Sequence, residues 1–152
     1  MNPDLLQQLN ALAYYQQPAP KSLANSFGIE TVYPILKATG LPTADLLKTY
    51  CEHIALQIAD AIANAPKAEE SSNKKMLVTG GGALNTYLMD CLQKNLSSQN
   101  IEVVLPEVKI INYKEALVMA LIGVLRWREE VNVLSSVTGA KKDSVGGAMW
   151  MP

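Results

Sequence analysis

The sequence predicts an α/β fold that is rich in helix and contains a short parallel sheet. Of the 152 residues 49% are apolar and 18% are charged, a composition typical of a chain that folds around a core. The patterns then alternate as helix, strand, helix, strand, helix, which is typical of parallel strands with a right-handed crossover. We expect one domain over 1–152, with a helical lead-in at 1–42, the alternating core at 43–130 and a C-terminal strap at 131–152.

The lead-in is expected to contain two helical stretches around a proline turn. The leucines of Pro3–Ala13 recur at helical spacing, which predicts a helix there. Pro18-Ala19-Pro20 then requires an extended or bent backbone. A second helical stretch is expected from Ser22 to Leu36, interrupted at Gly28 and Pro34.

The clearest helix is expected from Thr43 to Ala65. Thr43 is suited to cap its amino end, and Asp45 suits the dipole of its first turn. One apolar stripe with a period of about 3.6 residues runs along it: Leu46, Leu47, Tyr50, Cys51, Ile54, Ala55, Ile58 and Ile62. His53 is expected to be a partly buried structural residue of this helix. Pro66 ends it, and a polar loop is expected at Lys67–Lys75.

Two short strands are expected next. Met76–Thr79 shows no polar alternation, a pattern typical of a strand that is buried on both faces of a parallel sheet. A helix is expected at Leu84–Leu96, and a second strand at Ile101–Leu105 is stopped by Pro106. A two-stranded sheet is small for a domain, which indicates that part of a larger sheet is missing.

The last long helix is expected at Tyr113–Glu130, followed by an irregular strap at Ser135–Pro152. Six apolar residues of this helix are expected to point inward: Ala116, Leu117, Ala120, Leu121, Val124 and Leu125.

Several function classes receive no support from the composition. The net charge is −1 and no long basic run exists, so a nucleic-acid partner lacks electrostatic support. Cys51, Cys91 and the single histidine are too few for a zinc site, and both cysteines are expected to be reduced core thiols. The amino terminus has no apolar run, and the apolar stretch Ala116–Leu125 is half the length that spans a bilayer. We therefore expect no metal site, no membrane segment, and a soluble, cytoplasmic protein.

The strongest local signal for chemistry is Thr79-Gly80-Gly81-Gly82-Ala83-Leu84-Asn85, between a buried strand and a helix. Glycines let a backbone approach a ligand closely, and a helix amino end attracts phosphate or ribose oxygens. A tight turn without a ligand fits the pattern equally well. A P-loop is excluded because its Lys-Ser/Thr pair is missing. A dinucleotide fingerprint needs a small residue in place of Asn85, although Glu107 could act as its acidic ribose ligand.

Two further segments contain candidate residues. Asn112-Tyr113-Lys114-Glu115-Ala116 is expected to open the last long helix, where Glu115 is either a solvated first-turn residue or a cleft carboxylate that orients a water or hydroxyl. Lys21 and Ser22 place a cation and a hydroxyl after the proline turn, where an ordinary capped turn is the simpler interpretation.

Four segments together resemble the anhydro-N-acetylmuramic acid kinase family. Pro18-Ala19-Pro20-Lys21-Ser22 is similar to the family's Pro-Pro-Lys-Ser stretch, and Leu77–Asn85 to its Gly-Gly-Gly-Ala-x-Asn segment. Asn112-x-x-Glu115-Ala116 is similar to its Asp-x-x-Glu-Ala segment, and Val137-Thr138-Gly139-Ala140 to its closing Val-Thr-Gly-Ala. The order and approximate spacing of all four agree over nearly the whole chain.

The resemblance implies the C-terminal part of an actin-like (ribonuclease H-like) ATPase lobe. Family members are ATP-dependent transferases of peptidoglycan recycling. They phosphorylate the 6-hydroxyl of 1,6-anhydro-N-acetylmuramic acid while water opens the anhydro ring, giving N-acetylmuramic acid 6-phosphate. Magnesium accompanies ATP in such chemistry because it neutralises phosphate charge during the transfer.

The resemblance also implies roles for single residues. Gly80, Gly81 and Gly82 would face the nucleotide, and Asn85 would sit at the start of the following helix. Glu115 would lie in the sugar cleft and help to position the ring-opening water. Lys21, Ser22 and Asn112 would lie on the substrate side: Lys21 and Ser22 near the rim of the cleft, and Asn112 where the family has aspartate.

The chain departs from the family in length. The Ser-Gly-Thr-Ser-x-Asp-Gly phosphate loop and the Asp-x-Gly-Pro-x-Asn segment with the catalytic aspartate have no counterpart in it. We therefore expect a C-terminal fragment, a remnant or a half-gene that is inactive alone and that forms homo-oligomers or joins a missing amino-terminal lobe. The alternatives are a non-catalytic interaction module and a fragment of a chaperone-type actin-like ATPase.

Overall fold

A computed structural model describes residues 1–18, 21–65 and 74–150. The chain divides into two compact units, of which the first joins Met1–Val78 to Gly82–Leu105 and the second joins Thr79–Gly81 to Pro106–Pro152. The α/β prediction is confirmed, since six α-helices of the described residues accompany a two-stranded parallel sheet.

Helix α1 (Pro3–Asn10) opens the first unit and confirms the predicted amino-terminal helix. Asn2 caps it, because its Oδ1 accepts a hydrogen bond from the Leu5 N–H at 2.9 Å. Leu5 and Leu9 are buried against Val32. A 3₁₀ turn at Ala13–Gln16 follows.

The second helical stretch begins later than predicted and continues through both expected breaks. Residues 21–24 have no regular structure, and the helical backbone runs from Ser26 through a π-helical turn at Gly28–Val32 into α2 (Tyr33–Ala38). The prediction that Pro34 interrupts the helix is wrong. Pro34 lies in the first turn of α2, where a missing N–H costs little, and the wider π turn leads into it.

The long helix α3 (Thr43–Ala63) confirms the clearest prediction, although its amino-terminal cap differs. Pro42, not Thr43, precedes the helix, so Thr43 is already helical and makes no capping bond. Asp45 lies in the first turn, as predicted, and its carboxylate also pairs with the amino terminus of Met1 at 3.2 Å.

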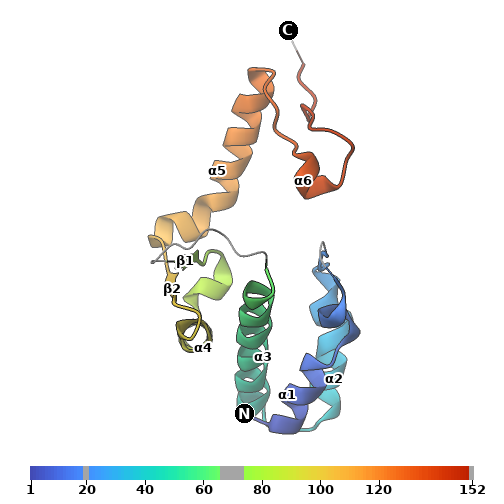
Figure 1. Cartoon of the computed structure of the whole chain (residues 1–152), viewed down its shortest axis with the longest axis vertical. Helices are drawn as coiled ribbons and strands as arrows, with labels where there is room; N and C mark the ends of the chain where they lie inside the picture. Colours follow the sequence, from blue (N-terminus) through green and yellow to red (C-terminus); the bar gives the residue numbers. More distant parts are fainter. Residues whose placement is uncertain (19–20, 66–73, 151–152) are drawn as a thin grey trace. The chain divides into compact units, whose positions relative to one another are not determined.

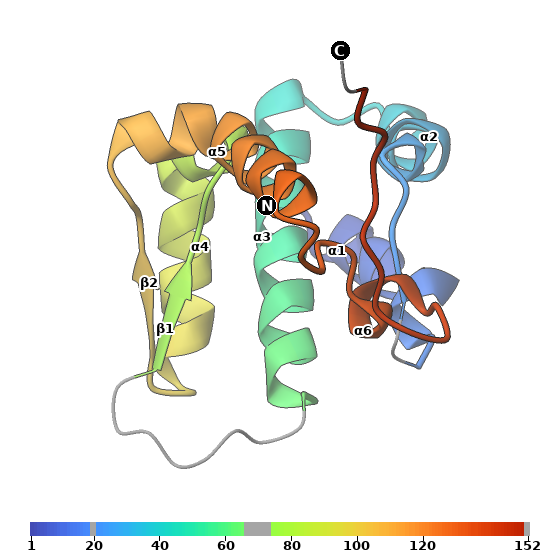
Figure 2. The ribbon, with the colours of Figure 1, turned by 90° about the horizontal axis from the view of Figure 1, so that it is seen from above.

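The buried residues of α3 lie on two faces rather than on one stripe. Ala55 and Ala59 pack against α4 (Thr86–Ser97), whereas Thr49 and His53 are fully buried on the side of α1. Leu47, predicted to be in the stripe, is 61% exposed. Because helices cover α3 on both sides, small and polar residues occupy its closest contacts (Figure 2).

The sheet pairs β1 (Lys74–Leu77) with β2 (Ile101–Val104) in parallel, from Lys74 opposite Ile101 to Leu77 opposite Val104. The two strands run side by side along α4 (Figure 2). Gln93 of α4 satisfies a backbone group on β2, since its side-chain oxygen accepts the Val103 N–H at 2.9 Å.

The prediction that the first strand is buried on both faces is wrong within this chain. Lys74 and Lys75, predicted to lie in a loop, are exposed strand residues, and residues 67–73 of that loop lie outside the described part. Met76 packs against the clusters of α4, while Leu77 on the opposite face is 61% exposed. The chain supplies helix cover for one face of the strand pair among the described residues.

The second unit contains α5 (Val108–Trp127) and the segment that follows it. The helix begins five residues before the predicted Tyr113 and ends three before the predicted Glu130. The expectation that its apolar residues point inward is wrong here, because Leu117, Leu121 and Val124 are each more than half exposed. Besides the residues Thr79–Gly81, the described part of this unit contains α5, the short helix α6 (Ser135–Thr138) and the strap (Figure 1).

The strap is fixed by a few polar contacts rather than by a core. Asn132 donates to the Ile122 and Gly146 carbonyls at 3.2 Å each and accepts from the Gly146 N–H at 2.7 Å. Hydrogen bonds from the Ser135 hydroxyl and N–H lower the pKa of Asp143. The bond from Asn132 to Ile122 connects the strap to α5, and the other bonds hold the strap together.

Gly146 leaves no room for a side chain, which gives a direct test of the strap. A Cβ at Gly146 would stand 2.7 Å from Val133 Cγ2, whereas a Cβ at Gly123 of α5 meets nothing within 4 Å. We expect Gly146→Ala to destabilise the strap by about 1–3 kcal/mol, measured as faster hydrogen exchange over 132–147. Gly123→Ala, in an open helical position, should leave that exchange unchanged. Equal hydrogen-exchange rates over 132–147 in the two variants would contradict the close packing of Gly146 against Val133.

A buried polar network joins α1 to α3 in the first unit. The His53 ring is fully buried, with Nδ1 2.6 Å from Asn10 Oδ1 and Nε2 3.0 Å from the Tyr15 hydroxyl. Since Asn10 Oδ1 can only accept, His53 Nδ1 donates and Nε2 accepts from Tyr15. Gln57 donates to the same Asn10 oxygen at 3.0 Å. His53 is therefore structural, as predicted, and more deeply buried than expected.

Burial lowers the pKa of His53 from 6.5 to about 4. Between these values the unfolded chain binds a proton that the folded chain does not, so we expect the free energy of unfolding to fall as the pH drops from 6.5 to 4. The limiting slope of this single group is about 1.4 kcal/mol per pH unit. Denaturant unfolding at several pH values measures it. His53→Asn should lose this slope, and an unchanged slope in the variant would contradict the assignment.

Candidate functional site

The glycine turn follows the carboxyl end of β1, and the segment leading into α5 follows the carboxyl end of β2. Because the strands are parallel, both segments leave from the same edge of the sheet. The pairing continues one step further, since the Val78 N–H donates to the Val104 carbonyl at 3.0 Å. In open α/β sheets this edge is the usual place for a ligand.

Two glycines of the turn, Gly80 and Gly81, belong to the second unit and leave the backbone accessible. Gly80 has φ +82°, in the left-handed region that favours glycine. A Cβ at Gly81 would meet no atom within 4 Å. The predicted close approach of a ligand therefore has free space at Gly81, and its occupation by a nucleotide stays a prediction.

The other two predicted nucleotide residues, Gly82 and Asn85, belong to the first unit. Asn85 caps α4, as its Oδ1 accepts from the Leu88 N–H at 3.1 Å and its amide faces Cys51 Sγ at 3.6 Å. Its expected position at the start of that helix is confirmed. A Cβ at Gly82 would lie 3.8 Å from Leu88 Cδ2, an ordinary contact.

The interpretation of Glu115 as a first-turn helix residue is wrong. Since α5 begins at Val108, Asn112 lies about one turn and Glu115 about two turns into the helix, beyond the reach of its amino-terminal dipole. Ile110 and Ile111, which precede the predicted start of the helix, are already helical. Both Asn112 and Glu115 are exposed, which leaves the cleft-carboxylate hypothesis for Glu115 open.

Lys114 belongs to the same region, and no role was predicted for it from the sequence. Its Nζ lies 3.8 Å from the position that a Cβ on Gly80 would occupy. The side chain is half-buried, unlike its neighbours Tyr113 and Glu115. The sequence shows Lys114 within the Asn112–Ala116 segment, but only the fold shows that its ammonium lies beside Gly80.

Lys21 and Ser22 lie in the first unit and serve local structure there. Lys21 Nζ donates to the Tyr15 carbonyl at 3.1 Å and lies 5.0 Å from the centroid of the Tyr14 ring. Ser22 is exposed and precedes the helical backbone by four residues, so it caps no helix. Ala19 and Pro20 of the predicted turn lie outside the described residues.

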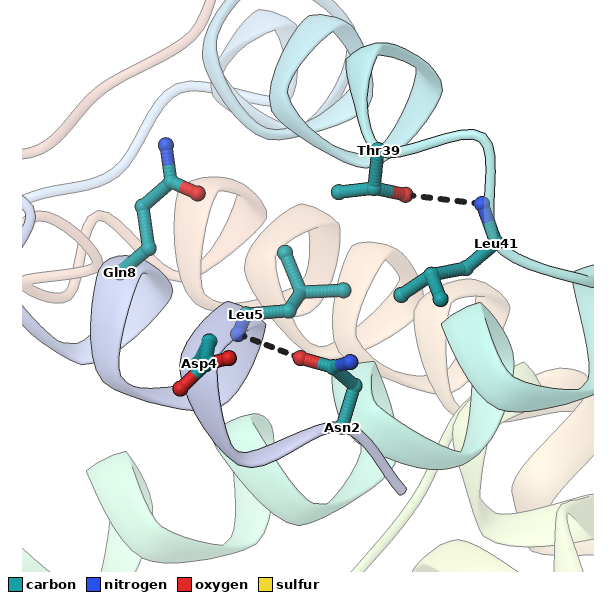
Figure 3. A pocket seen from close by; sticks show the side chains of 6 residues that line it. All are labelled: Asn2, Asp4, Leu5, Gln8, Thr39 and Leu41. Atoms are coloured by element: carbon teal, nitrogen blue, oxygen red, sulfur yellow. Dashed lines mark hydrogen bonds between the residues drawn. The ribbon is translucent and has the colours of Figure 1, made fainter.

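One pocket of about 250 Å³ lies in the first unit, and it contains none of the predicted site residues. Figure 3 shows Asp4 and Gln8 of α1 on one side and Thr39 and Leu41 on the other. Its polar atoms are partly used internally, since Thr39 Oγ1 accepts the Leu41 N–H at 3.2 Å. We assign no ligand to it.

Within residues 1–18, 21–65 and 74–150, no group of three or more His, Cys, Asp or Glu side chains is placed to hold a metal ion. The helices of that part also lack the combination of length and hydropathy that crosses a bilayer.

Comparison with known proteins places the chain in a family. A family model described as anhydro-N-acetylmuramic acid kinase matches residues 1–152. The chain is 32% identical over 159 residues to the anhydro-N-acetylmuramic acid kinase of Hydrogenovibrio crunogenus, covering 100% of this chain and 41% of the relative. The enzyme of Vibrio cholerae is 30% identical over 153 residues, covering 100% of this chain and 40% of the relative.

A third relative shows a similar identity. The anhydro-N-acetylmuramic acid kinase of Rhodococcus erythropolis is 32% identical over 151 residues, covering 97% of this chain and 36% of the relative. The chain thus spans about two fifths of the length of these curated relatives. Because the family match extends from the first residue to the last, the chain belongs to the anhydro-N-acetylmuramic acid kinase family.

Proposed function

We propose that this chain is the C-terminal part of an ATP-dependent kinase that converts 1,6-anhydro-N-acetylmuramic acid to N-acetylmuramic acid 6-phosphate. The observation that carries the proposal is the family match over residues 1–152, supported by relatives of that name. The parallel strand pair with a glycine turn at its carboxyl edge fits the corresponding part of an actin-like lobe.

In this proposal water adds to the anomeric carbon of the anhydro sugar and the bond from that carbon to the 6-oxygen breaks. The 6-oxygen takes the γ-phosphoryl group of ATP, and ADP leaves. The proton lost by the water passes to a base that lies outside this chain. Glu115 orients the water from α5, with Asn112 one turn before it on the substrate side.

The nucleotide is proposed to approach the backbone of Gly80 and Gly81, where the free space at Gly81 fits a ligand. Gly82 and Asn85 continue the same segment into α4. Magnesium, bound to the ATP phosphates, would neutralise charge during the transfer. No described side-chain cluster of this chain is suited to hold it independently.

The exposed apolar residues indicate that the chain works with further polypeptide. Leu117, Leu121 and Val124 of α5 and Leu77 of β1 are each more than half exposed. We propose that the rest of the kinase, or a second copy of the chain, covers them, as exposed apolar strands and helix faces tend to associate. Light scattering at several concentrations should show self-association of the 152-residue chain. A strictly monomeric chain would contradict this proposal.

A chimera tests the proposed function. The amino-terminal three fifths of the Hydrogenovibrio crunogenus kinase, which this chain does not match, are joined to Met1–Pro152. We expect the chimera to release ADP when the anhydro sugar is present, and neither half alone to do so, because positioning and charge neutralisation come from both lobes. ADP release by the 152-residue chain alone would overturn the assignment as a part of the enzyme.

A further inference from the structure

Lys114 has an unusual environment for a lysine. Its ammonium lies beside the backbone of Gly80 in the second unit, 3.8 Å from the position of an added Cβ. Lys114 is half-buried, and its side chain brings the charge to this turn. A side chain introduced at position 80 would occupy the space in front of this ammonium.

No counter-ion for Lys114 is found among the described residues. Lys75 and Arg128 form salt bridges with Glu102 and Glu130, but no carboxylate lies within salt-bridge distance of Lys114 in this part of the chain. The helix offers none either, because the positions three and four residues away on both sides are apolar: Ile110, Ile111, Leu117 and Val118. Glu115 is the next residue and projects to a different side of the helix.

We propose that Lys114 binds the phosphate chain of the nucleotide at the Gly80–Gly81 turn. This inference rests on the proposed kinase function and adds an anion-binding residue to a site otherwise made of backbone. The ammonium, the left-handed Gly80 and the open Gly81 lie in one compact unit. An anion that approaches the exposed turn meets the charge there. Adenosine has no phosphate, so Lys114 should not contribute to its binding affinity.

Paired titrations of the 152-residue chain with ADP and with adenosine test the proposal, followed by NMR chemical shifts. Lys114→Met keeps the length and apolar character of the stem and removes the charge. We expect it to weaken ADP binding roughly tenfold, the scale of a charge-assisted hydrogen bond, and to leave adenosine binding unchanged. Lys109→Met, an exposed lysine of the same helix, should bind both ligands as the wild type does. Lys114→Arg keeps the charge and should retain ADP binding.

The outcomes separate this inference from the function on which it rests. Suppose that the wild type binds ADP and that Lys114→Met binds ADP equally well, or that its affinities for ADP and adenosine fall to the same degree. Lys114 then does not bind the phosphates, and the kinase assignment is unaffected. If Lys114→Met fails to fold, a loss of ADP but not of adenosine binding in Lys114→Glu supports the proposal, and equal loss of both ligands overturns it. A wild type that binds neither ligand overturns the nucleotide site and this inference together.

Discussion

Replacing Glu115 with glutamine in the chimeric kinase should lower kcat/KM for the anhydro sugar by about 10²-fold or more, the usual scale for a positioned acid–base group. Glutamine keeps the size of the side chain and removes its charge, so it can no longer orient the water as a carboxylate does. Glu115 is exposed two turns into α5, so the substitution leaves no buried group unsatisfied. Steady-state kinetics with both substrates measures the effect.

The affinity for ATP should hardly change in this variant, because Glu115 acts on the sugar in the proposed mechanism. Glu129→Gln is a matched control, since Glu129 is an exposed carboxylate just beyond the same helix. It should turn over the sugar at the wild-type rate. Near-normal turnover by Glu115→Gln would contradict a catalytic role and would mean that Glu115 is only a surface residue of α5.

Gly81→Val should abolish ATP binding in the chimera through steric exclusion. The φ angle of Gly81 is not in the left-handed region, and a Cβ there meets nothing within 4 Å, so the fold tolerates the side chain. A valine would therefore fill the space that we propose for the nucleotide rather than strain the turn. Calorimetry with ATP measures the loss, and circular dichroism checks the fold.

A graded series sharpens this test. Gly81→Ala should weaken ATP binding less than Gly81→Val does, because it excludes less volume. Gly80→Val is unsuitable as a control, since φ +82° at Gly80 strains any other side chain. Unchanged ATP affinity in a folded Gly81→Val protein would mean that the turn is merely structural.

Local signals in the sequence predicted the helices and strands whose patterns are strong. The apolar repeat of Thr43–Ala63 and the β-branched residues of Ile101–Val104 specify their elements within a few residues. The predicted start of α5 at Tyr113 was wrong, because the helix already begins at Val108, directly after Glu107. Burial also could not be derived from the pattern, because an apolar Leu77 or Leu121 is buried only when another element covers it.

The site was predicted as a set of segments, and its geometry was not. Motif resemblance indicated the glycine turn and the segment around Glu115, but the position of the Lys114 ammonium beside Gly80 brings together residues far apart in sequence. The same holds for the bonds of His53 to Asn10 and Tyr15. Such contacts depend on the packing of helices and strands, which no local pattern contains.

The most direct test of the central claim is the product that the chimera makes in H₂¹⁸O. Mass spectrometry should find the anhydro sugar increased by one phosphoryl group and one water, with the ¹⁸O at the anomeric position. That result requires ring opening and phosphoryl transfer in one enzyme, with this chain as its C-terminal part. A folded chimera that binds ATP and returns the anhydro sugar unchanged would contradict the claim.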